Sequence, residues 1–300
     1  MNLLSCPICS SNKLNNYHDF VWQSPERKVM LCDSCGSYSL FPLLTKDEQS
    51  DFDKQYDKYI SKRAGFVNEH IDEEFDDLVE DSIEERYRDV EQWFPQGVSV
   101  LEIGAEKGGF LDRISQIASD ITAVDACPEY TDVLAKKGYP AYKYITEVPE
   151  YIKFDRICFY SLLEHIVEPI PFLSSVKKHL APDGYVVIEI PSAKEPLIDL
   201  YSIEEFKTFY FQAMHPYVYS EDGVRYVLEK AGLEVFDVQY KQRYGLSNHL
   251  GWLKNGTPGG VQYFSEIFSS NAEIEYIKSL ELSGNTDTIY IIAKHANSEG

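Results

Sequence analysis

Two acidic residues, Glu102 and Asp125, stand at the ends of two short apolar runs, residues 98–103 and 121–124. Runs of this length and composition predict buried parallel strands. The glycine-bearing loop 104–109 between them allows a ligand to approach the backbone closely, near the start of the following helix. An acid at the tip of the second strand of such a unit can bind both hydroxyls of a ribose. The segment therefore predicts a site for a nucleoside cofactor.

The composition of the loop narrows the choice of cofactor. A dinucleotide fingerprint requires a second glycine where this chain has Glu106, whose charge would repel a pyrophosphate. A phosphate-cradling loop requires Gly-Lys-Ser/Thr, but Lys107 is followed by Gly108 and Gly109. An acidic loop preceded by Glu102 suits a cationic or zwitterionic ligand. S-adenosylmethionine fits, because it carries an adenosine, a sulfonium and an amino group but no phosphate.

The order of these pieces resembles the class I S-adenosylmethionine-dependent methyltransferases. The first motif is Glu102-Ile103-Gly104-Ala105-Glu106-Lys107-Gly108, and Asp125 is the ribose acid. Residues 154–165, 180–191 and 215–235 continue in the family's order as the fourth strand and helix start, a turn with the fifth strand, and a later helix with its strand. The resemblance implies an α/β fold, a Rossmann-like, seven-stranded and mostly parallel sheet with helices on both faces.

The residues that we expect to bind the cofactor lie beyond the carboxyl ends of the strands, where open α/β sheets place their ligands. Glu102 would meet the methionine amino group, Ala126 would pack on adenine, and Glu147 would lie near the adenine edge. Relatives place a lid before the sheet, where Arg63 could pair with the methionine carboxylate; an amphipathic helix packed through its aromatics is the alternative. The full predicted set is Tyr59, Arg63, Glu102, Gly104, Ala105, Gly108, Asp125, Ala126, Glu147, Tyr160 and Ser161.

Methyl transfer to a hydroxyl or carbon acid requires a base on the far side of the methyl group, and histidine suits this role near neutral pH. His165, His215 and His249 each follow a predicted strand. We favour His215 as the base, whereas His165 could instead cap a helix or support the site. The chain also compares with Glu-x-x-Glu-His methyltransferases that use magnesium. Ser161 replaces the first acid of that motif, but Glu164, His165 and His215 could still bind a metal.

The stretch 242–249 contains more polar and aromatic residues than a simple connection between strands needs. We interpret it as part of an acceptor pocket, with a surface loop packed through Tyr244 and Trp252 as the alternative. The predicted substrate-binding residues are Tyr217, Arg243, Tyr244, Asn248 and His249.

Four cysteines form two Cys-x-x-Cys pairs, Cys6 with Cys9 and Cys32 with Cys35. Two such pairs in one short segment supply four thiolates for a tetrahedral structural zinc, with disulfides as the lesser alternative in a reducing compartment. Alternating aromatic and apolar residues between the pairs predict short strands. We therefore expect a small zinc ribbon over residues 1–42.

The rest of the chain divides into two parts. Residues 43–96 have acidic helical spacing and would form a lid or linker, opened by a capping box of Thr45 and Glu48. Residues 97–300 would form the methyltransferase domain, with an acceptor-binding insertion near 242–283. Residues 233–240 and 286–294 are expected to be neighbouring strands at its end.

The formal net charge of −21, from 49 acidic and 28 basic residues, makes a nucleic-acid substrate improbable because such a surface repels phosphate backbones. No apolar stretch approaches the ~20 residues of a membrane-spanning helix, and the N-terminus does not read as a signal peptide. We expect a cytoplasmic protein without membrane contact. A homodimer is possible, but the sequence does not decide it.

A zinc ribbon fused to this domain resembles the methyltransferases of nucleotide-linked deoxysugars, including sugar 3-C-methyltransferases. Those enzymes tend to have Tyr-x-Glu-His where this chain has Gln212-Ala213-Met214-His215. The difference favours O-methylation of a sugar, a nucleotide-sugar or another small polar metabolite over C-methylation. A non-catalytic module that binds the cofactor and a partner is the alternative of another class.

Overall fold

The computed structural model describes residues 5–55, 74–258, 264 and 266–296. Its main sheet has seven strands in the order β10-β11-β8-β7-β4-β5-β6. Strand β11 is antiparallel to both neighbours, and the other pairs are parallel. This confirms the expected mostly parallel sheet. The strands are β4 (Ser99–Ile103), β5 (Asp120–Val124), β6 (Ala141–Tyr142), β7 (Phe154–Tyr160), β8 (Leu180–Pro191), β10 (Leu233–Lys241) and β11 (Thr288–His295).

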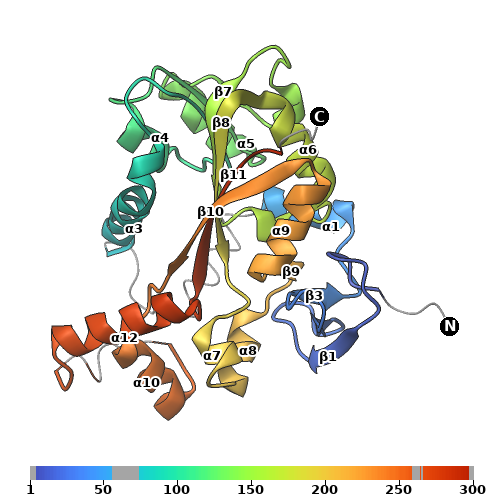
Figure 1. Ribbon diagram of the computed structural model, residues 1–300, viewed down its shortest axis with the longest axis vertical. Helices are drawn as coiled ribbons and strands as arrows, with labels where there is room; N and C mark the ends of the chain where they lie inside the picture. Colours follow the sequence, from blue (N-terminus) through green and yellow to red (C-terminus); the bar gives the residue numbers. More distant parts are fainter. Residues whose placement is uncertain (1–4, 56–73, 259–263, 265, 297–300) are drawn as a thin grey trace.

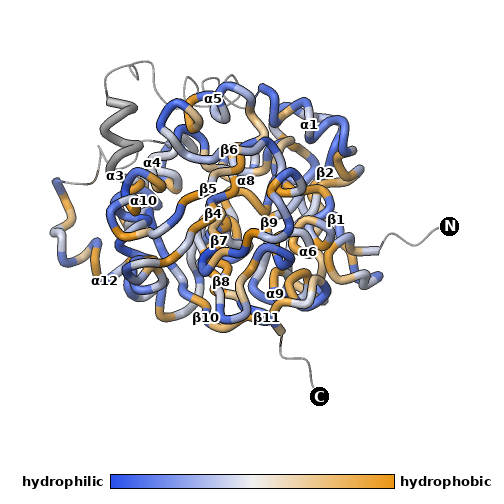
Figure 2. Tube along the Cα trace, turned by 90° about the horizontal axis from the view of Figure 1, so that it is seen from above, coloured by the Kyte–Doolittle hydropathy of each residue, from blue (hydrophilic) through white to orange (hydrophobic). Residues whose placement is uncertain are grey.

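Helices cover both faces of the sheet because its central strands are apolar on both sides (Figures 1 and 2). On one face, α6 (Pro169–His179) and α9 (Glu221–Lys230) pack against residues such as Leu101 and Ile157. On the other face, α4 (Gly109–Ile114) and the end of α3 (Glu74–Val90) pack against residues such as Val100 and Cys158. Helix α5 (Pro128–Lys136) joins this second layer through Leu134.

The N-terminal cysteine segment forms a separate antiparallel sheet of four strands, β1-β2-β3-β9. The first three strands belong to the ribbon: β1 (Leu14–His18), β2 (Lys28–Cys32) and β3 (Tyr38–Phe41). The fourth, β9 (Tyr217–Val218), comes from the middle of the chain, directly after His215. Figure 1 shows the blue ribbon strands beside β9 and α9. The ribbon is therefore joined to the larger domain through backbone hydrogen bonds.

Shorter helices complete the end of the molecule where the parallel strands terminate. They are α1 (Lys46–Lys54), α7 (Pro196–Asp199), α8 (Glu204–Tyr210), α10 (Leu246–Asn255) and α12 (Ser270–Ser283), with 3-10 turns at Ile145–Glu147 and Leu163–His165. A further 3-10 turn, Glu91–Trp93, precedes β4. The capping box at α1 is present, because the Thr45 hydroxyl accepts from the Glu48 amide and Glu48 accepts from the Thr45 amide. Among the described residues, no helix is long and apolar enough to cross a membrane.

One local expectation needs correction. Residues 180–185 were predicted to form a turn before the fifth strand, whereas β8 already begins at Leu180. Leu180 pairs with Phe154 and Tyr185 pairs with Arg156, so residues 181–184 bulge out of the ladder. The Pro-Asp-Gly sequence thus produces an irregularity inside the strand.

Candidate active site

A cavity of about 540 Å³ opens at the carboxyl ends of β4, β5 and β7. This volume is within the roughly 300–1,000 Å³ range of small-molecule sites. Helix α1 closes one side through Gln49, Ser50 and Asp53. The other lining residues include Ile103, Gly104, Glu106, Asp125, Ala126, Tyr130, Lys143, Ile145, Tyr160, Ser161, Leu162, His165 and Phe172.

The loop after β4 folds tightly because two glycines adopt positive φ angles. Gly104 has φ +77° and its amide donates to the Val124 carbonyl at 2.8 Å. Gly108 has φ +79°, and a Cβ there would lie 2.8 Å from Cδ2 of Leu134 on α5. Glycine at position 108 is therefore required both by the backbone and by the packing of the loop against α5.

Asp125 follows β5 directly and lines the cavity. Its Oδ2 accepts a hydrogen bond from the Glu106 amide at 2.8 Å, and its Oδ1 accepts from the Cys127 amide at 2.8 Å. These bonds fix the carboxylate and leave each oxygen a further acceptor site. Burial is the main reason that the pKa of Asp125 is raised to about 6. At neutral pH the group is ionised and suited to bind two ribose hydroxyls.

The cavity is acidic on more than one side, which fits a cationic ligand. Burial raises the pKa of Asp53, on α1, to about 6, and its charge in turn helps to raise the pKa of Asp125. Glu106, on the loop after β4, also lines the cavity. A sulfonium and an amino group would relieve this repulsion, whereas a phosphate would increase it. The residues present therefore fit S-adenosylmethionine.

Glu102 occupies a different position from the one predicted. Its side chain is only 4% exposed and is not part of the cavity lining, and its Oε2 has no hydrogen-bond partner among the residues that the structure describes. Burial raises its pKa well above the usual range, opposed by the nearby charge of Arg86. Strand alternation explains this, because Ile103 and Leu101 face α6 and α9 while residue 102 faces the α3 layer. This geometry does not favour a direct contact between Glu102 and the methionine amino group.

The other predicted cofactor residues fall into three groups. Gly104, Asp125, Ala126, Tyr160 and Ser161 line the cavity. Ala105, Gly108 and Glu147 do not: the first two shape the loop, and the exposed Glu147 accepts from the Lys143 amide at 3.0 Å. Tyr59 and Arg63 lie outside the described residues.

Three predicted catalytic residues lie together beside the cavity. Ligand atoms of Glu164, His165 and His215 all lie within 4.8 Å of one another, and the two imidazole rings are 4.6 Å apart. Burial lowers the pKa of His165 to about 4, although hydrogen bonds to the Met214 and Ser161 backbones oppose this. His165 is therefore neutral and held by the backbone. Both Glu164 oxygens are buried without a hydrogen-bond partner among the described residues, and burial raises the pKa of Glu164 to about 8.

Two tyrosines from later segments extend this group. The hydroxyls of Tyr210 and Tyr219 are buried and have no hydrogen-bond partner within the described ranges, and Glu164 contributes to the raised pKa of each. Sequence reasoning missed both, because an aromatic residue in an apolar segment predicts core packing. We call the set that faces Glu164 the polar cluster; its members are Glu164, His165, Tyr210, His215, Tyr219 and Arg243.

A buried ion pair supports the floor between the cavity and the polar cluster. Arg86 of α3 donates to Glu189 of β8 through Nε at 2.8 Å and Nη2 at 3.3 Å. Tyr290 and Ser161 also donate to Glu189. Although burial alone would raise it, the charge of Arg86 lowers the pKa of Glu189 to about 2. Ser161, which lines the cavity, has φ +47°, a strained angle that this bond helps to hold.

The residues of the predicted acceptor segment 242–249 lie in different environments, some exposed and some buried. Arg243 and Tyr244 are half-exposed, and Nε of Arg243 donates to Asp287 Oδ1 at 3.1 Å. His249 is 1% exposed and its Nδ1 lies 2.6 Å from the Tyr276 hydroxyl, so it packs α10 against α12. Asn248, beside it on α10, is half-buried. Tyr217 is buried and donates to the Val167 carbonyl at 3.0 Å, which places it in the core.

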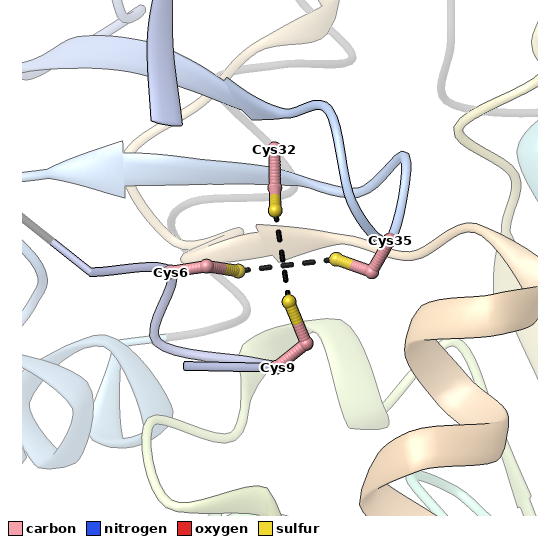
Figure 3. Close-up of side chains that lie close together, drawn as sticks. All are labelled: Cys6, Cys9, Cys32 and Cys35. Atoms are coloured by element: carbon pink, nitrogen blue, oxygen red, sulfur yellow. Dashed lines mark hydrogen bonds between the residues drawn. The ribbon is translucent and has the colours of Figure 1, made fainter. Parts of the chain in front are cut away.

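The four ribbon cysteines point to a common centre, as Figure 3 shows. The Sγ atoms of Cys6 and Cys35 are 3.8 Å apart, and those of Cys9 and Cys32 are 3.6 Å apart. A tetrahedron with Zn–S bonds of about 2.3 Å has edges of about 3.8 Å. All six cysteines of the chain are free of disulfides. The geometry fits a four-thiolate zinc site with no coordination position left for a catalytic water.

The ribbon holds the segment that carries His215 from both sides. Ala213 donates to the Trp22 carbonyl at 3.0 Å, and Leu40 donates to the Pro216 carbonyl at 3.0 Å. Next to these bonds, Tyr38 pairs with Val218 in the β3–β9 ladder. The Gln212 amide nitrogen lies 3.1 Å from a ring nitrogen of His215. The position of His215 therefore depends on the ribbon.

Together, the strand order, the glycine loop and Asp125 define a Rossmann-like fold with a nucleoside-cofactor cavity. A family model described as a methyltransferase domain matches residues 67–238, which is more than half of the chain. The chain therefore belongs to this methyltransferase family, and it is an S-adenosylmethionine-dependent methyltransferase.

Solved structures agree with this fold. Magnesium protoporphyrin IX methyltransferase from Synechocystis PCC 6803, with bound S-adenosylhomocysteine, has a TM-score of 0.51 at 11% identity over 84% of this chain and 100% of that chain. A chain from the complex of the Haloferax volcanii Trm112 methyltransferase activator with a methyltransferase has a TM-score of 0.50 at 14% identity, over 77% of this chain and 100% of that chain. No curated protein matches the sequence. At these identities the similarity concerns the fold alone.

Proposed function

We propose that this protein transfers a methyl group to a hydroxyl of a small polar metabolite, such as a sugar or a nucleotide-linked sugar. The observation that carries the proposal is the polar cluster beside the cofactor cavity. Three of its members, Glu164, Tyr210 and Tyr219, have buried polar atoms without a hydrogen-bond partner in the part of the chain that the structure describes. Leaving such a group unpaired costs about 1–3 kcal/mol, so a ligand rich in hydroxyls is the expected partner.

Bound S-adenosylmethionine would supply an electrophilic methyl group. Asp125 would hold its ribose, and the loop 104–108 would support the methionine part. Ser161 and His165 line the cavity next to the rest of the polar cluster, which would orient the acceptor hydroxyl toward the methyl group. Such alignment alone supplies much of the acceleration of a displacement reaction.

His215 is the proposed general base. Of the two neighbouring imidazoles, His165 is bound to backbone groups at Met214 and Ser161 and is best suited to position its neighbour. His215 is contacted by the side chain of Gln212 and is flanked by the ribbon bonds. A base in this position would accept the hydroxyl proton as the new O–C bond forms, a contribution of about 10²–10⁴-fold.

The test is transfer of isotope-labelled methyl from S-adenosylmethionine to a panel of sugars, nucleotide-sugars and other polyhydroxylated metabolites, followed by mass analysis of the product. O-methylation predicts a product whose added methyl is attached to oxygen. A carbon-linked methyl would instead support the sugar C-methyltransferase alternative. Binding of S-adenosylhomocysteine without transfer to any member of the panel would favour a non-catalytic cofactor-binding module.

A metal-assisted form of the same reaction is a second candidate, because Glu164, His165 and His215 can offer three ligand atoms at one point. A carboxylate with two imidazoles is a common ligand set for divalent cations. A cation there would bind the acceptor hydroxyl and lower its pKa. Turnover that is abolished by EDTA and restored by Mg²⁺ or Mn²⁺, but not by Zn²⁺ alone, would support this form over His215 as base.

The four-cysteine cluster is proposed to bind one structural zinc. The supporting observation is the agreement between the sulfur separations and those of a tetrahedral site. Metal analysis of the purified protein should give about one zinc per chain, and the Cys9→Ser variant should lose it.

A further inference from the structure

Arg243 is held rigidly by a buried carboxylate. Its Nε donates to Asp287 Oδ1 at 3.1 Å, and its backbone amide donates to Asp287 Oδ2 at 2.9 Å. Asp287 is 2% exposed, and its Oδ2 also accepts from the Gln242 side chain at 3.1 Å and the Tyr244 amide at 3.3 Å. The aspartate is thus fully bonded, and it fixes one edge of the guanidinium group.

The other edge of the same guanidinium is available. Nη1 and Nη2 of Arg243 have no hydrogen-bond partner among the described residues, and half of the side-chain surface is accessible. Arg27 and Arg86 differ, because their Nη atoms donate to neighbouring side chains. Arg243 therefore presents two parallel N–H groups whose direction is already fixed.

These N–H groups lie within electrostatic range of the polar cluster. The charge of Arg243 lowers the pKa values of Glu164, Glu195 and Tyr210, against the stronger effect of burial. Glu189, also in range, is already paired with Arg86.

We propose that Arg243 is the specificity residue that binds an anionic group of the acceptor, a phosphate or a carboxylate, through Nη1 and Nη2. A planar fork of two N–H groups matches two oxygens of either anion. The inference rests on the proposed function and refines it: the acceptor is an anionic, hydroxyl-rich metabolite such as a sugar phosphate, a nucleotide-sugar or a sugar acid.

The experiment titrates S-adenosylhomocysteine-loaded protein with inorganic phosphate and with acetate while ¹H–¹⁵N spectra record the arginine Nε–H signals. A saturable shift of the Arg243 signal is expected with at least one anion. Arg225, which pairs with Glu221 on the surface of α9, is the internal control and should not shift. The anion that binds more tightly distinguishes a phosphate-bearing from a carboxylate-bearing acceptor.

Two substitutions of Arg243 test whether its Nη1 and Nη2 groups cause the anion-dependent shift. Arg243→Lys keeps a positive charge beside the buried Asp287 but loses the paired N–H groups, so folding should be preserved. Anion affinity, followed at the Tyr244 amide, should fall by about tenfold or more in R243K and in R243Q, and stay unchanged in R225Q. The wild type should likewise bind glucose 1-phosphate more tightly than glucose. R243K and R243Q should bind the two sugars equally.

The proposal is overturned by absence of a saturable shift at Arg243, by equal shifts at Arg225, or by full anion affinity in R243K. Affinity for S-adenosylhomocysteine is measured separately in each protein. If the cofactor product binds normally while anions do not, the anionic acceptor is wrong and the methyltransferase proposal stands. If methyl transfer to an anionic sugar occurs with equal efficiency in wild type and R243K, the fork is likewise excluded from recognition.

Discussion

Among the described residues, the cofactor cavity takes its wall from one stretch, residues 103–175, and from helix α1. The polar cluster instead collects side chains from positions 164, 210, 219 and 243 and depends on the ribbon at residues 6–41 for the placement of His215. The cofactor cavity can form as soon as the strands of its own stretch pair. The polar cluster forms only when distant segments have come together in the complete fold. We therefore expect the two regions to be separable by mutation.

The largest effect is expected from removal of the proposed general base, which should affect the polar cluster but not the cofactor cavity. His215→Ala should lower turnover by about 10²–10⁴-fold, because the proton acceptor is removed while Asp125 and the loop 104–108 are untouched. Isothermal titration should give an unchanged affinity for S-adenosylhomocysteine. His295→Ala is the matched control, since His295 contacts the Leu180 carbonyl at the opposite end of the sheet. A loss in H215A of less than about tenfold would exclude His215 as the base.

The next test acts on His215 from a distance. Cys32→Ser should release the ribbon and with it the bonds from Trp22 and Leu40 that flank His215. A displacement of about 1 Å can cost about 10²-fold in rate, so turnover should fall by about that factor. Cofactor affinity should change by less than about twofold, and Cys158→Ala, a buried thiol outside the ribbon, should behave like wild type in both assays. Equal loss of cofactor binding and turnover in C32S would mean that the two regions fold as one unit.

The reverse test acts on the cofactor side. Asp125→Asn should weaken binding of S-adenosylhomocysteine by about tenfold, equivalent to about 1.4 kcal/mol, because an amide cannot accept through both of its heavy atoms. Asp120→Asn, at the exposed start of the same strand, is the control and should bind normally. The anion-dependent shift of Arg243 should persist in D125N. Its disappearance would show coupling that the geometry does not predict.

The smallest expected effect is a pH dependence confined to the cofactor side. The pKa of Asp125 is raised to about 6, so the carboxylate is ionised above that value and becomes protonated as pH falls through it. Cofactor affinity should therefore be full at pH 7 and about fourfold weaker at pH 5.5, the ratio of the ionised fractions. Asp125→Asn should remove most of this dependence. A wild-type affinity that is flat between pH 5.5 and 7 would contradict the raised pKa.

The same contrast explains what the sequence could predict. The strand, loop and helix from residue 98 to 125 are encoded by apolar runs, glycines and an acid that are neighbours in the chain, so their arrangement follows from local rules. The cysteine spacing likewise predicted the cluster that the structure contains. The burial of Glu102 outside the cavity lining could not be predicted, because the direction of a strand residue depends on which layer covers each face. Tyr210, Tyr219 and the Arg86–Glu189 pair were missed because their contacts are between segments far apart in the chain.

The pairing of β3 with β9 also sets an order of assembly. A strand of two residues cannot hold its own position, and here it takes its edge from a sheet whose turns are clamped by four sulfurs. If the proposed zinc binds there, the supply of this metal in the cell would decide whether a newly made chain becomes active. Under zinc shortage, we expect a population of molecules that bind S-adenosylmethionine but do not transfer its methyl group. Addition of zinc should then activate them.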